Sequence, residues 1–229
     1  MKKLLTLVLA VTASGSGLAA HASPALVYGI RIYSEKENNR QALVSFPTDS
    51  PADVTELIDL SGYRFLAAAC NNDKYYMLHS DDGITVSSIL SLDLNTKRIS
   101  KVRDLDWKKD IAANIIFSDM TYDPNSSTLY ACGFNLEEAE VIEGETHAPF
   151  AIITIDPVTG DSEIVGSQDS YVLATLAADE YGLKGIDQYG TMWEVSKYSG
   201  QLDFDCIDTE MAPTGLPVSY THLTLPTTS

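Results

Sequence analysis

The sequence predicts an all-β protein built from repeated antiparallel sheets, and two observations carry that prediction. First, one turn pattern recurs between apolar strands: Asp or Ser, two or three variable residues, then Thr-Gly, Thr-Lys or Ser-Gly, within Ser91–Ile99, Thr154–Ser162 and Glu194–Leu202. Second, Pro, Gly and Asp-Asn clusters interrupt every apolar run before it reaches about ten residues, so no long amphipathic helix is expected. A hairpin turn that returns at the spacing of a small domain is typical of an array of sheets.

The first 22 residues have the pattern of a signal peptide. Lys2 and Lys3 precede an apolar run, and Ala20-His21-Ala22 matches an Ala-x-Ala cleavage site. The run is shorter than the roughly 20 apolar residues that a membrane-spanning helix needs. We therefore expect a mature chain that starts near Ser23 and is secreted, periplasmic or on the cell surface, with no membrane span.

The last twelve residues, 218–229, form an uncharged tail unrelated to the repeated pattern. This tail resembles the in-frame translation of a sequencing-library adapter. We interpret it as a non-native tail and expect the natural coding sequence to be cut off just before it. The alternative is a genuine polar tail.

The segment between these ends, 23–217, has 13 basic and 32 acidic side chains. Such a negative surface repels phosphate backbones and anionic lipids, which argues against nucleic-acid and membrane partners. Calcium or a cationic partner is compatible with it. The three cysteines, Cys70, Cys132 and Cys206, are an odd and widely spaced set. One disulfide is possible after export, but we favour three buried thiols.

Short or alternating apolar segments predict the strands in chain order. These are Leu26–Tyr33, Gln41–Phe46, Phe65–Cys70, Tyr75–His79, Ser87–Leu92, Ile115–Tyr122, Leu129–Phe134, Phe150–Ile155, Ser162–Val165, Leu173–Ala178, Leu183–Asp187, Met192–Val195 and Leu202–Cys206. They group into four units of about four strands, at about 25–60, 63–107, 115–168 and 171–209. An insertion at 135–148 lengthens the third unit, and small residues begin the units, where an inner strand would crowd a central axis.

The residues Leu129-Tyr130 and Ile155-Asp156-Pro157-Val158-Thr159-Gly160 carry a family resemblance. They resemble the blade signature of secreted bacterial β-propellers of the quinoprotein-like and YVTN-like kind. The resemblance implies a β-propeller, with about four four-stranded antiparallel blades present. Because closed propellers typically hold four to eight blades, we expect an incomplete fragment of a larger propeller that is poorly stable alone. The Trp-Asp and Gly-His marks of Trp-Asp repeats, and the repeated Trp pattern of quinone-dependent dehydrogenases, are absent, so neither function is implied.

The recurring turn residues Asp93, Asp156, Gly160 and Gly200 are predicted to be structural. An Asp before a turn accepts hydrogen bonds from backbone N–H groups two or three residues further on. A catalytic carboxylate is needed once, whereas these recur.

The inserted segment is rich in acidic side chains and is the candidate partner loop. Its residues are Glu137, Glu138, Glu140, Glu143, Glu145 and His147. Oxygen-rich clusters can bind calcium, although no EF-hand or repeat-in-toxin spacing is present. The alternative interpretation is a solvated hairpin loop.

Other chemistry-bearing residues give weaker patterns. His79 and His147 are isolated, so no zinc motif forms, and nucleophile-elbow, phosphate-loop and dinucleotide motifs are absent. The pairs Asp104/Asp106 and Asp203/Asp205 could share a strand face, but they fit an edge strand protected by charge. Trp193 is expected in the core. Trp107, flanked by Lys101, Arg103, Lys108 and Lys109, is the candidate exposed aromatic platform.

Two functional hypotheses follow. The first is an exported, noncatalytic propeller that binds a protein or glycan and needs no cofactor. The alternative is a glycan-active hydrolase or lyase with acidic residues at the central channel. An enzyme should bring two carboxylates, or a carboxylate and a His, to the axis from different blades.

Overall fold

The computed structural model describes residues 7–10, 26–33, 40–71, 73–142, 145–168, 172–179, 181–187 and 189–208. The predicted tail, most of the predicted signal peptide and Glu143 lie outside the described residues. The side chains of Glu145, Asp203, Asp205 and Cys206 are likewise not described, although the backbone of each belongs to a strand.

The described chain forms four four-stranded antiparallel sheets, one after another. The first sheet contains β1 (Leu7–Ala10), β2 (Leu26–Ile32), β3 (Gln41–Pro47) and β4 (Thr55–Asp59). The second contains β5 (Phe65–Asn71), β6 (Lys74–His79), β7 (Ser88–Asp93) and β8 (Ile99–Asp104). The third contains β9 (Ile115–Asp123), β10 (Thr128–Asn135), β13 (Phe150–Ile155) and β14 (Ser162–Gln168). The fourth contains β15 (Leu173–Ala178), β16 (Leu183–Asp187), β17 (Thr191–Val195) and β18 (Leu202–Asp208).

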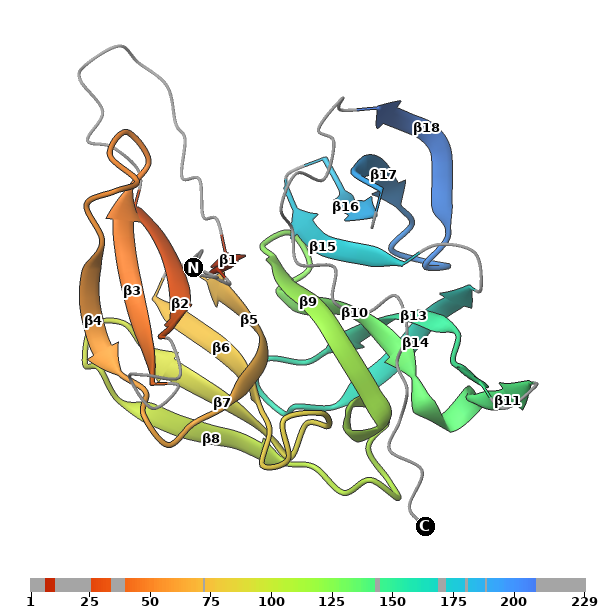
Figure 1. Ribbon diagram of the computed structural model, residues 1–229, viewed down its shortest axis with the longest axis horizontal. Coiled ribbons are helices and arrows are strands. Elements are labelled where there is room, and N and C mark those ends of the chain that lie inside the picture. Colours follow the sequence, from red (N-terminus) through yellow and green to blue (C-terminus); the bar gives the residue numbers. More distant parts are fainter. Residues whose placement is uncertain are drawn as a thin grey trace.

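The sheets follow one another around a common centre as an arc, with the first and fourth at its two ends (Figure 1). The strands β1, β5, β9 and β15 face the centre, and β4, β8, β14 and β18 are the opposite edge strands. This arrangement of successive four-stranded meanders is that of β-propeller blades. The strand β1 falls in the segment that the sequence identifies as a signal peptide, and it pairs with β2 through Leu7 and Arg31.

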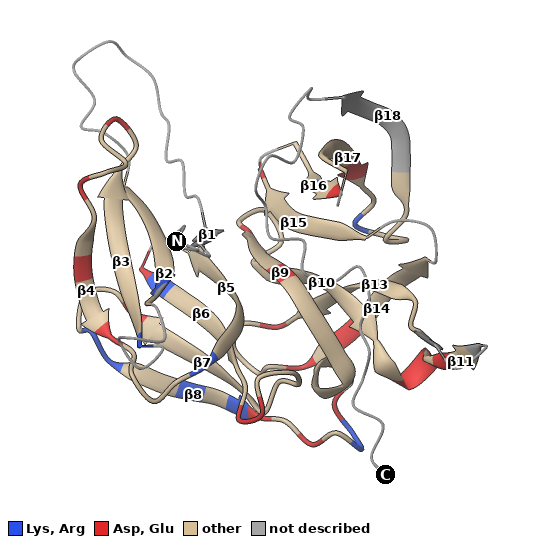
Figure 2. Cartoon of the chain, viewed as in Figure 1, with Lys and Arg blue, Asp and Glu red and all other residues tan. Residues whose placement is uncertain are grey.

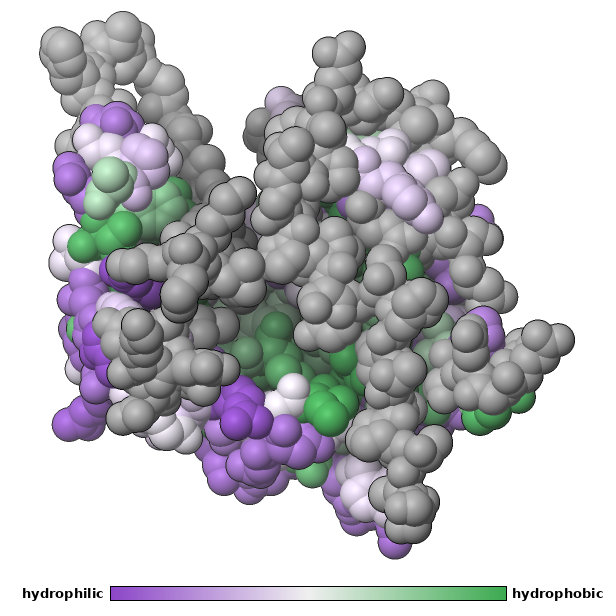
Figure 3. Space-filling view, viewed as in Figure 1, coloured by the Kyte–Doolittle hydropathy of each residue, from purple (hydrophilic) through white to green (hydrophobic). Residues whose placement is uncertain are grey.

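Three hydrophobic clusters fill the spaces between successive sheets. One joins the first two sheets around Leu43 and Met77, the next joins the second and third around Leu78 and Ile153, and the last joins the third and fourth around Cys132. Apolar residues also show in the hollow at the centre of the face seen in Figure 3, with hydrophilic residues below them. The core is therefore divided among the interfaces between sheets, because each sheet buries its apolar residues against the sheet next to it.

A repeat in the pairing register shows how these interfaces are built. A tyrosine on the second strand lies opposite a hydroxyl residue on the third strand in three successive sheets, as Tyr28 with Ser45, Tyr76 with Ser91 and Tyr130 with Thr154. Tyr76 and Tyr130 are buried in the clusters shared with the following sheet. The fourth sheet has Lys184 opposite Glu194 at this position. Its face therefore carries charge where the three preceding sheets carry an aromatic ring.

The recurring turns have one shared geometry. Oδ1 of Asp93 accepts hydrogen bonds from the backbone N–H groups of Asn95 and Thr96, and Oδ1 of Asp156 accepts from Val158 and Thr159. In the third turn Ser196 Oγ accepts in the same way from Tyr198 and Ser199. The last position of each turn has a positive φ: 60° at Lys97, 74° at Gly160 and 66° at Gly200. The side chain at the start and the left-handed residue at the end together close each hairpin.

Apart from the apolar β1, which lies in the predicted signal peptide, the strands that the sequence did not predict are mostly polar. The edge strands β4 and β8 have mostly exposed or half-buried side chains, so the apolar alternation that identifies a strand is absent from them. The insertion contains a short two-stranded sheet of β11 (Glu140–Ile142) and β12 (Glu145–His147). Within the described ranges, helix is limited to the short 3-10 turns η2 (Ile111–Asn114) and η3 (Leu136–Glu138). In the described part of the chain no helix has the length and apolar character needed to cross a membrane.

Candidate functional site

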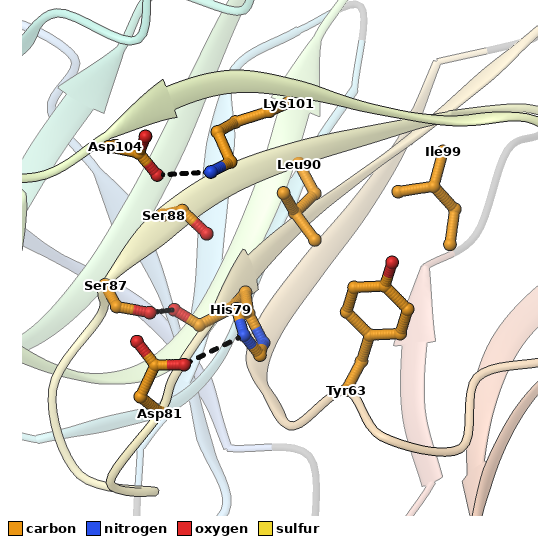
Figure 4. A pocket seen from close by; sticks show the side chains of 9 residues that line it. All are labelled: Tyr63, His79, Asp81, Ser87, Ser88, Leu90, Ile99, Lys101 and Asp104. Atoms are coloured by element: carbon orange, nitrogen blue, oxygen red, sulfur yellow. Dashed lines mark hydrogen bonds and ion pairs between the residues drawn. The ribbon is translucent and has the colours of Figure 1, made fainter.

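A pocket of about 380 Å³ lies on the face of the second sheet that turns toward the first sheet (Figure 4). Its floor includes Leu90 of β7 and Ile99 of β8, which belong to the hydrophobic cluster between these two sheets. The remaining lining residues are Tyr63, His79, Asp81, Ser87, Ser88, Lys101 and Asp104. The pocket thus combines an apolar floor with polar walls.

The imidazole of His79, at the end of β6, is held on several sides. Its Nδ1 lies 3.0 Å from the carbonyl oxygen of Arg64, and its Nε2 lies 3.4 Å from Oδ1 of Asp81. The rings of Tyr63 and Phe65 make edge contacts with it, at centroid distances of 5.5 and 5.9 Å. This aromatic packing fixes the orientation of His79 at the pocket wall.

The loop that carries Asp81 is ordered by its neighbour Asp82. The carboxylate of Asp82 accepts hydrogen bonds from the backbone N–H groups of Ile84 and Thr85 and from the hydroxyls of Ser80 and Thr85. Partial burial opposes ionisation, but these hydrogen bonds prevail and hold the pKa of Asp82 well below its usual range. The charged Asp82 therefore fastens the loop, and Asp81 is presented to solvent with a side chain that is 81 % exposed.

The opposite wall carries an ion pair. Lys101 Nζ lies 2.7 Å from Oδ1 of Asp104, and both residues belong to the edge strand β8. Ser88 lies directly opposite Asp104 across the sheet. The pocket lining therefore includes both donors and acceptors of hydrogen bonds, together with the half-exposed ring of Tyr63. Such a lining suits a ligand with many hydroxyl groups.

Trp107 lies in the loop that follows β8, and 67 % of it is exposed. Lys108 Nζ sits 5.1 Å from the centroid of its ring. The loop is tied down because the carbonyl oxygen of Trp107 accepts a hydrogen bond from Asn114 Nδ2 and Oδ2 of Asp110 accepts one from the N–H of Asp106. Trp107 is therefore an exposed ring on a well-fastened loop. Trp193, expected in the core, is buried.

The acidic insertion spreads its carboxylates over several elements. Glu137 and Glu138 lie in η3, which Asn135 caps by accepting a hydrogen bond from the N–H of Glu137. Glu140 lies opposite the exposed His147 in the two-stranded sheet. No group of three or more His, Cys, Asp or Glu side chains comes together within the described ranges. Calcium binding by this loop stays a hypothesis.

The carboxylates of the described inner strands, Asp119 and Asp123, both belong to β9. Oδ2 of Asp119 accepts a hydrogen bond from the N–H of Leu176 on β15, and burial raises the pKa of Asp119 to about 7. Oδ2 of Asp123 lies 2.7 Å from Lys197 Nζ in the fourth sheet. Each carboxylate thus links the third sheet to the fourth, and they do not form a set contributed by different sheets.

The thiols of Cys70 and Cys132 are free and buried. Burial raises the pKa of Cys70 to about 11 and that of Cys132 to about 12. Both are therefore protonated, unreactive side chains in the core.

The sequence identified Trp107 and Lys101 but did not identify the pocket. Tyr63, His79 and Asp81 are separated from Lys101 and Asp104 by about twenty or more residues, and no local motif connects them. The one usable signal was strand register, because His79 and Ser88 face each other on adjacent strands. Lys101 and Asp104 could be added to this pair only once β8, which has no apolar alternation, had been recognised as the strand next to β7.

The succession of four-stranded antiparallel sheets places the protein among the β-propellers. Comparison with solved structures found distant matches. The structures found include one from a nidogen/laminin complex, 13 % identical, with a TM-score of 0.48, covering 83 % of this chain and 58 % of that one. Oligogalacturonate lyase in complex with manganese is 13 % identical, with a TM-score of 0.47, covering 79 % of this chain and 48 % of that one. Oligogalacturonate lyase from Vibrio parahaemolyticus is 10 % identical, with the same TM-score and coverages.

This chain therefore spans about half the length of these structures. At such low identities the likeness concerns the fold alone. No protein-family model matches the sequence. A search of curated proteins also found no match.

Proposed function

We propose that the protein is an exported, noncatalytic β-propeller protein that binds a glycan, with one sugar residue held in the pocket on the face of the second sheet that turns toward the first. The observation that carries the proposal is the pocket lining, in which an aromatic ring, an ion pair and the exposed carboxylate of Asp81 surround an apolar floor. A volume of about 380 Å³ falls in the range of small-molecule sites.

The chemistry of the lining matches that of a sugar. Sugar hydroxyls both donate and accept hydrogen bonds, and the pocket offers the acceptors Asp81 and Asp104 together with the donors Lys101 and Ser88. The exposed part of the Tyr63 ring gives an apolar surface for the C–H face of the sugar. Because Tyr63 stacks on Phe65 at 5.7 Å and packs against His79, its ring is already in place before binding. Such preorganisation lowers the entropic cost of association.

A catalytic function has less support. The hydrolase or lyase hypothesis needs acid and base groups that converge from different sheets, and the inner-strand carboxylates Asp119 and Asp123 are both committed to contacts within the protein. Export rests on the signal-peptide pattern of residues 1–22 and on the acidic composition. Mass spectrometry of the secreted protein should find Ser23 or a close neighbour as the first residue.

The binding test uses a panel of immobilised neutral and acidic glycans, followed by titration calorimetry with the glycans retained. Tyr63→Ala removes the ring, and we expect at least a tenfold loss of affinity. Tyr189→Ala is the matched control, since Tyr189 is 67 % exposed and lies in a turn of the fourth sheet. Asp81→Asn provides a second pocket variant whose exposed side chain makes loss of folding an unlikely cause of weaker binding. Wild-type affinity in both pocket variants would remove the proposal.

A further inference from the structure

The basic residues of this acidic protein gather on one edge. Six of the fifteen Lys and Arg residues fall within 97–109, a stretch that contains only two acidic residues. They are Lys97, Arg98, Lys101, Arg103, Lys108 and Lys109. This basic edge runs along β8 from the turn before it to the loop after it, as the line of blue along β8 shows (Figure 2).

Three of these cations are free of carboxylate partners. Arg103 is paired with Asp110 and Asp161, Lys101 with Asp104, and Lys109 with Asp106. By contrast, Lys97, Arg98 and Lys108 are exposed and make no ion pair with any described residue. At physiological ionic strength charges further away than about 8 Å are largely screened, so distant acidic side chains act only weakly on these three cations.

Protection of an edge strand explains why β8 is charged but does not require that the charge be positive. Charged side chains on edge strands discourage pairing with other chains. The other edge strands carry only acidic charges, namely Glu56 and Asp59 on β4, Glu163 on β14, and Asp203, Asp205 and Asp208 on β18. Because acidic residues protect those three edges, we take the lysines and arginines of β8 to have a further role that needs positive charge.

The backbone at Lys97 supports this conclusion. Lys97 has a φ of 60°, and the matching turns of the third and fourth sheets have Gly160 and Gly200 there. A left-handed conformation costs a lysine energy that it does not cost a glycine. The chain thus has a cation at a position where the two matching turns have glycine.

We infer that the glycan is anionic and lies along β8, with its uronate or sulfate groups on Lys97, Arg98 and Lys108 and one sugar in the pocket. This inference rests on the proposed function, because Lys101 and Asp104 belong both to β8 and to the pocket wall. A six-residue strand is about 20 Å long, so the edge suits an extended polymer with repeated charges. The exposed ring of Trp107 lies beyond the end of β8 and offers it a further apolar contact.

The test measures binding of alginate, dextran sulfate, uncharged dextran and polyglutamate by calorimetry. The variant Lys97→Gln/Arg98→Gln/Lys108→Gln neutralises the unpaired cations. The control Tyr181→Glu/Tyr189→Glu/Tyr198→Glu changes the net charge equally, at exposed positions of the fourth sheet. We expect alginate or dextran sulfate to bind, to weaken as salt increases, and to lose at least tenfold in affinity in the neutralised variant, while the control keeps at least a third of the wild-type affinity.

Each other outcome overturns the inference in a distinct way. One such outcome is that uncharged dextran or another neutral glycan binds as tightly as the anionic ones, that Tyr63→Ala abolishes this binding, and that the neutralised variant binds like wild type. The proposed sugar pocket would then be supported, and the inference of an anionic ligand would be wrong. If polyglutamate binds as tightly as the glycans, the basic edge is a surface for acidic protein. Equal losses of affinity in the neutralised variant and the control would show that binding depends only on the net charge of the protein and not on the basic edge. If no glycan binds, both proposals fail.

Discussion

Asp119 joins the third sheet to the fourth, because its Oδ2 accepts a hydrogen bond of 2.8 Å from the backbone N–H of Leu176. Its Oδ1 accepts a second hydrogen bond, from the N–H of Met120. The carboxyl group is buried between two inner strands, and burial raises its pKa to about 7 despite both hydrogen bonds.

Stability should therefore depend on pH through Asp119. In the folded protein the carboxyl binds a proton more tightly than in the unfolded chain, where its pKa is close to 4. Its contribution to stability is greatest below about pH 4, is lost as pH rises to about 7, and stays lost above that. Asp119→Asn cannot ionise but keeps an oxygen for Leu176. We compare the free energy of unfolding of this variant with that of wild type at each pH. As the pH is raised from 4 to 8, we expect that difference to change in favour of the variant by on the order of 2 to 4 kcal/mol.

Urea denaturation of both proteins at these two pH values measures that difference. Titration of the other carboxylates is common to both proteins and cancels. A difference that is the same at pH 4 and pH 8 would show that Asp119 has an ordinary pKa.

Asp156 should act in its turn through its oxygen and not through its charge. Asp156→Ala removes the acceptor for the N–H groups of Val158 and Thr159, and we expect a loss of about 1 to 2 kcal/mol. Asp156→Asn retains an acceptor and should lose less than half of that amount. Glycan binding should remain unchanged in both. Loss of binding in Asp156→Ala with an unchanged denaturation midpoint would instead indicate a functional carboxylate.

Two glycines with positive φ should respond differently to the same substitution. Gly62 has a φ of 91° and nothing within 4 Å of an added Cβ, so Gly62→Ala pays only for the backbone conformation, about 1 kcal/mol. At Gly160 an added Cβ would lie 2.8 Å from Cβ of Arg103, in the contact between the second and third sheets. We expect Gly160→Ala to be more destabilising than Gly62→Ala by at least about 1 kcal/mol in denaturant titrations. Equal losses would mean that the sheets separate easily at this contact.

Lys97→Gly should be more stable than wild type and should bind an anionic glycan more weakly. Removing the side chain at a φ of 60° relieves backbone strain, and we expect a gain of about 0.5 to 1 kcal/mol in the free energy of unfolding. The added freedom of glycine in the unfolded chain subtracts from this gain. The same variant should bind dextran sulfate more weakly. A variant that is less stable than wild type would show that the lysine side chain stabilises the turn.

The two described thiols should be invisible to a thiol reagent in the folded protein. In a Cys206→Ser background, Ellman's reagent at pH 8 should label less than a tenth of Cys70 and Cys132, because burial raises the pKa of both thiols. Labelling in guanidinium chloride should then detect both. Rapid labelling without denaturant would show that the interfaces between sheets open readily.

The sequence was informative wherever structure depends on neighbouring residues. Asp93 and Asp156 accept hydrogen bonds from residues two and three positions further on, so the turn could be predicted from a short pattern. The all-β propeller architecture followed from the recurrence of that pattern and from short apolar strands. Polar strands gave no such signal, and β4 and β8 were therefore missed. The failure to predict β8 mattered most, because this strand provides both a wall of the pocket and the basic edge.

The sequence by itself thus determined the class of fold, the turn chemistry and the presence of clustered basic residues in an acidic chain. Only the tertiary structure decided which distant residues meet: Tyr63 with Lys101 in one pocket, and Asp119 with Leu176 across two sheets. Hydrogen bonds within a turn are set by a few dihedral angles of adjacent residues. Contacts between sheets depend instead on how many separate strands pair, twist and pack together, which no short pattern encodes.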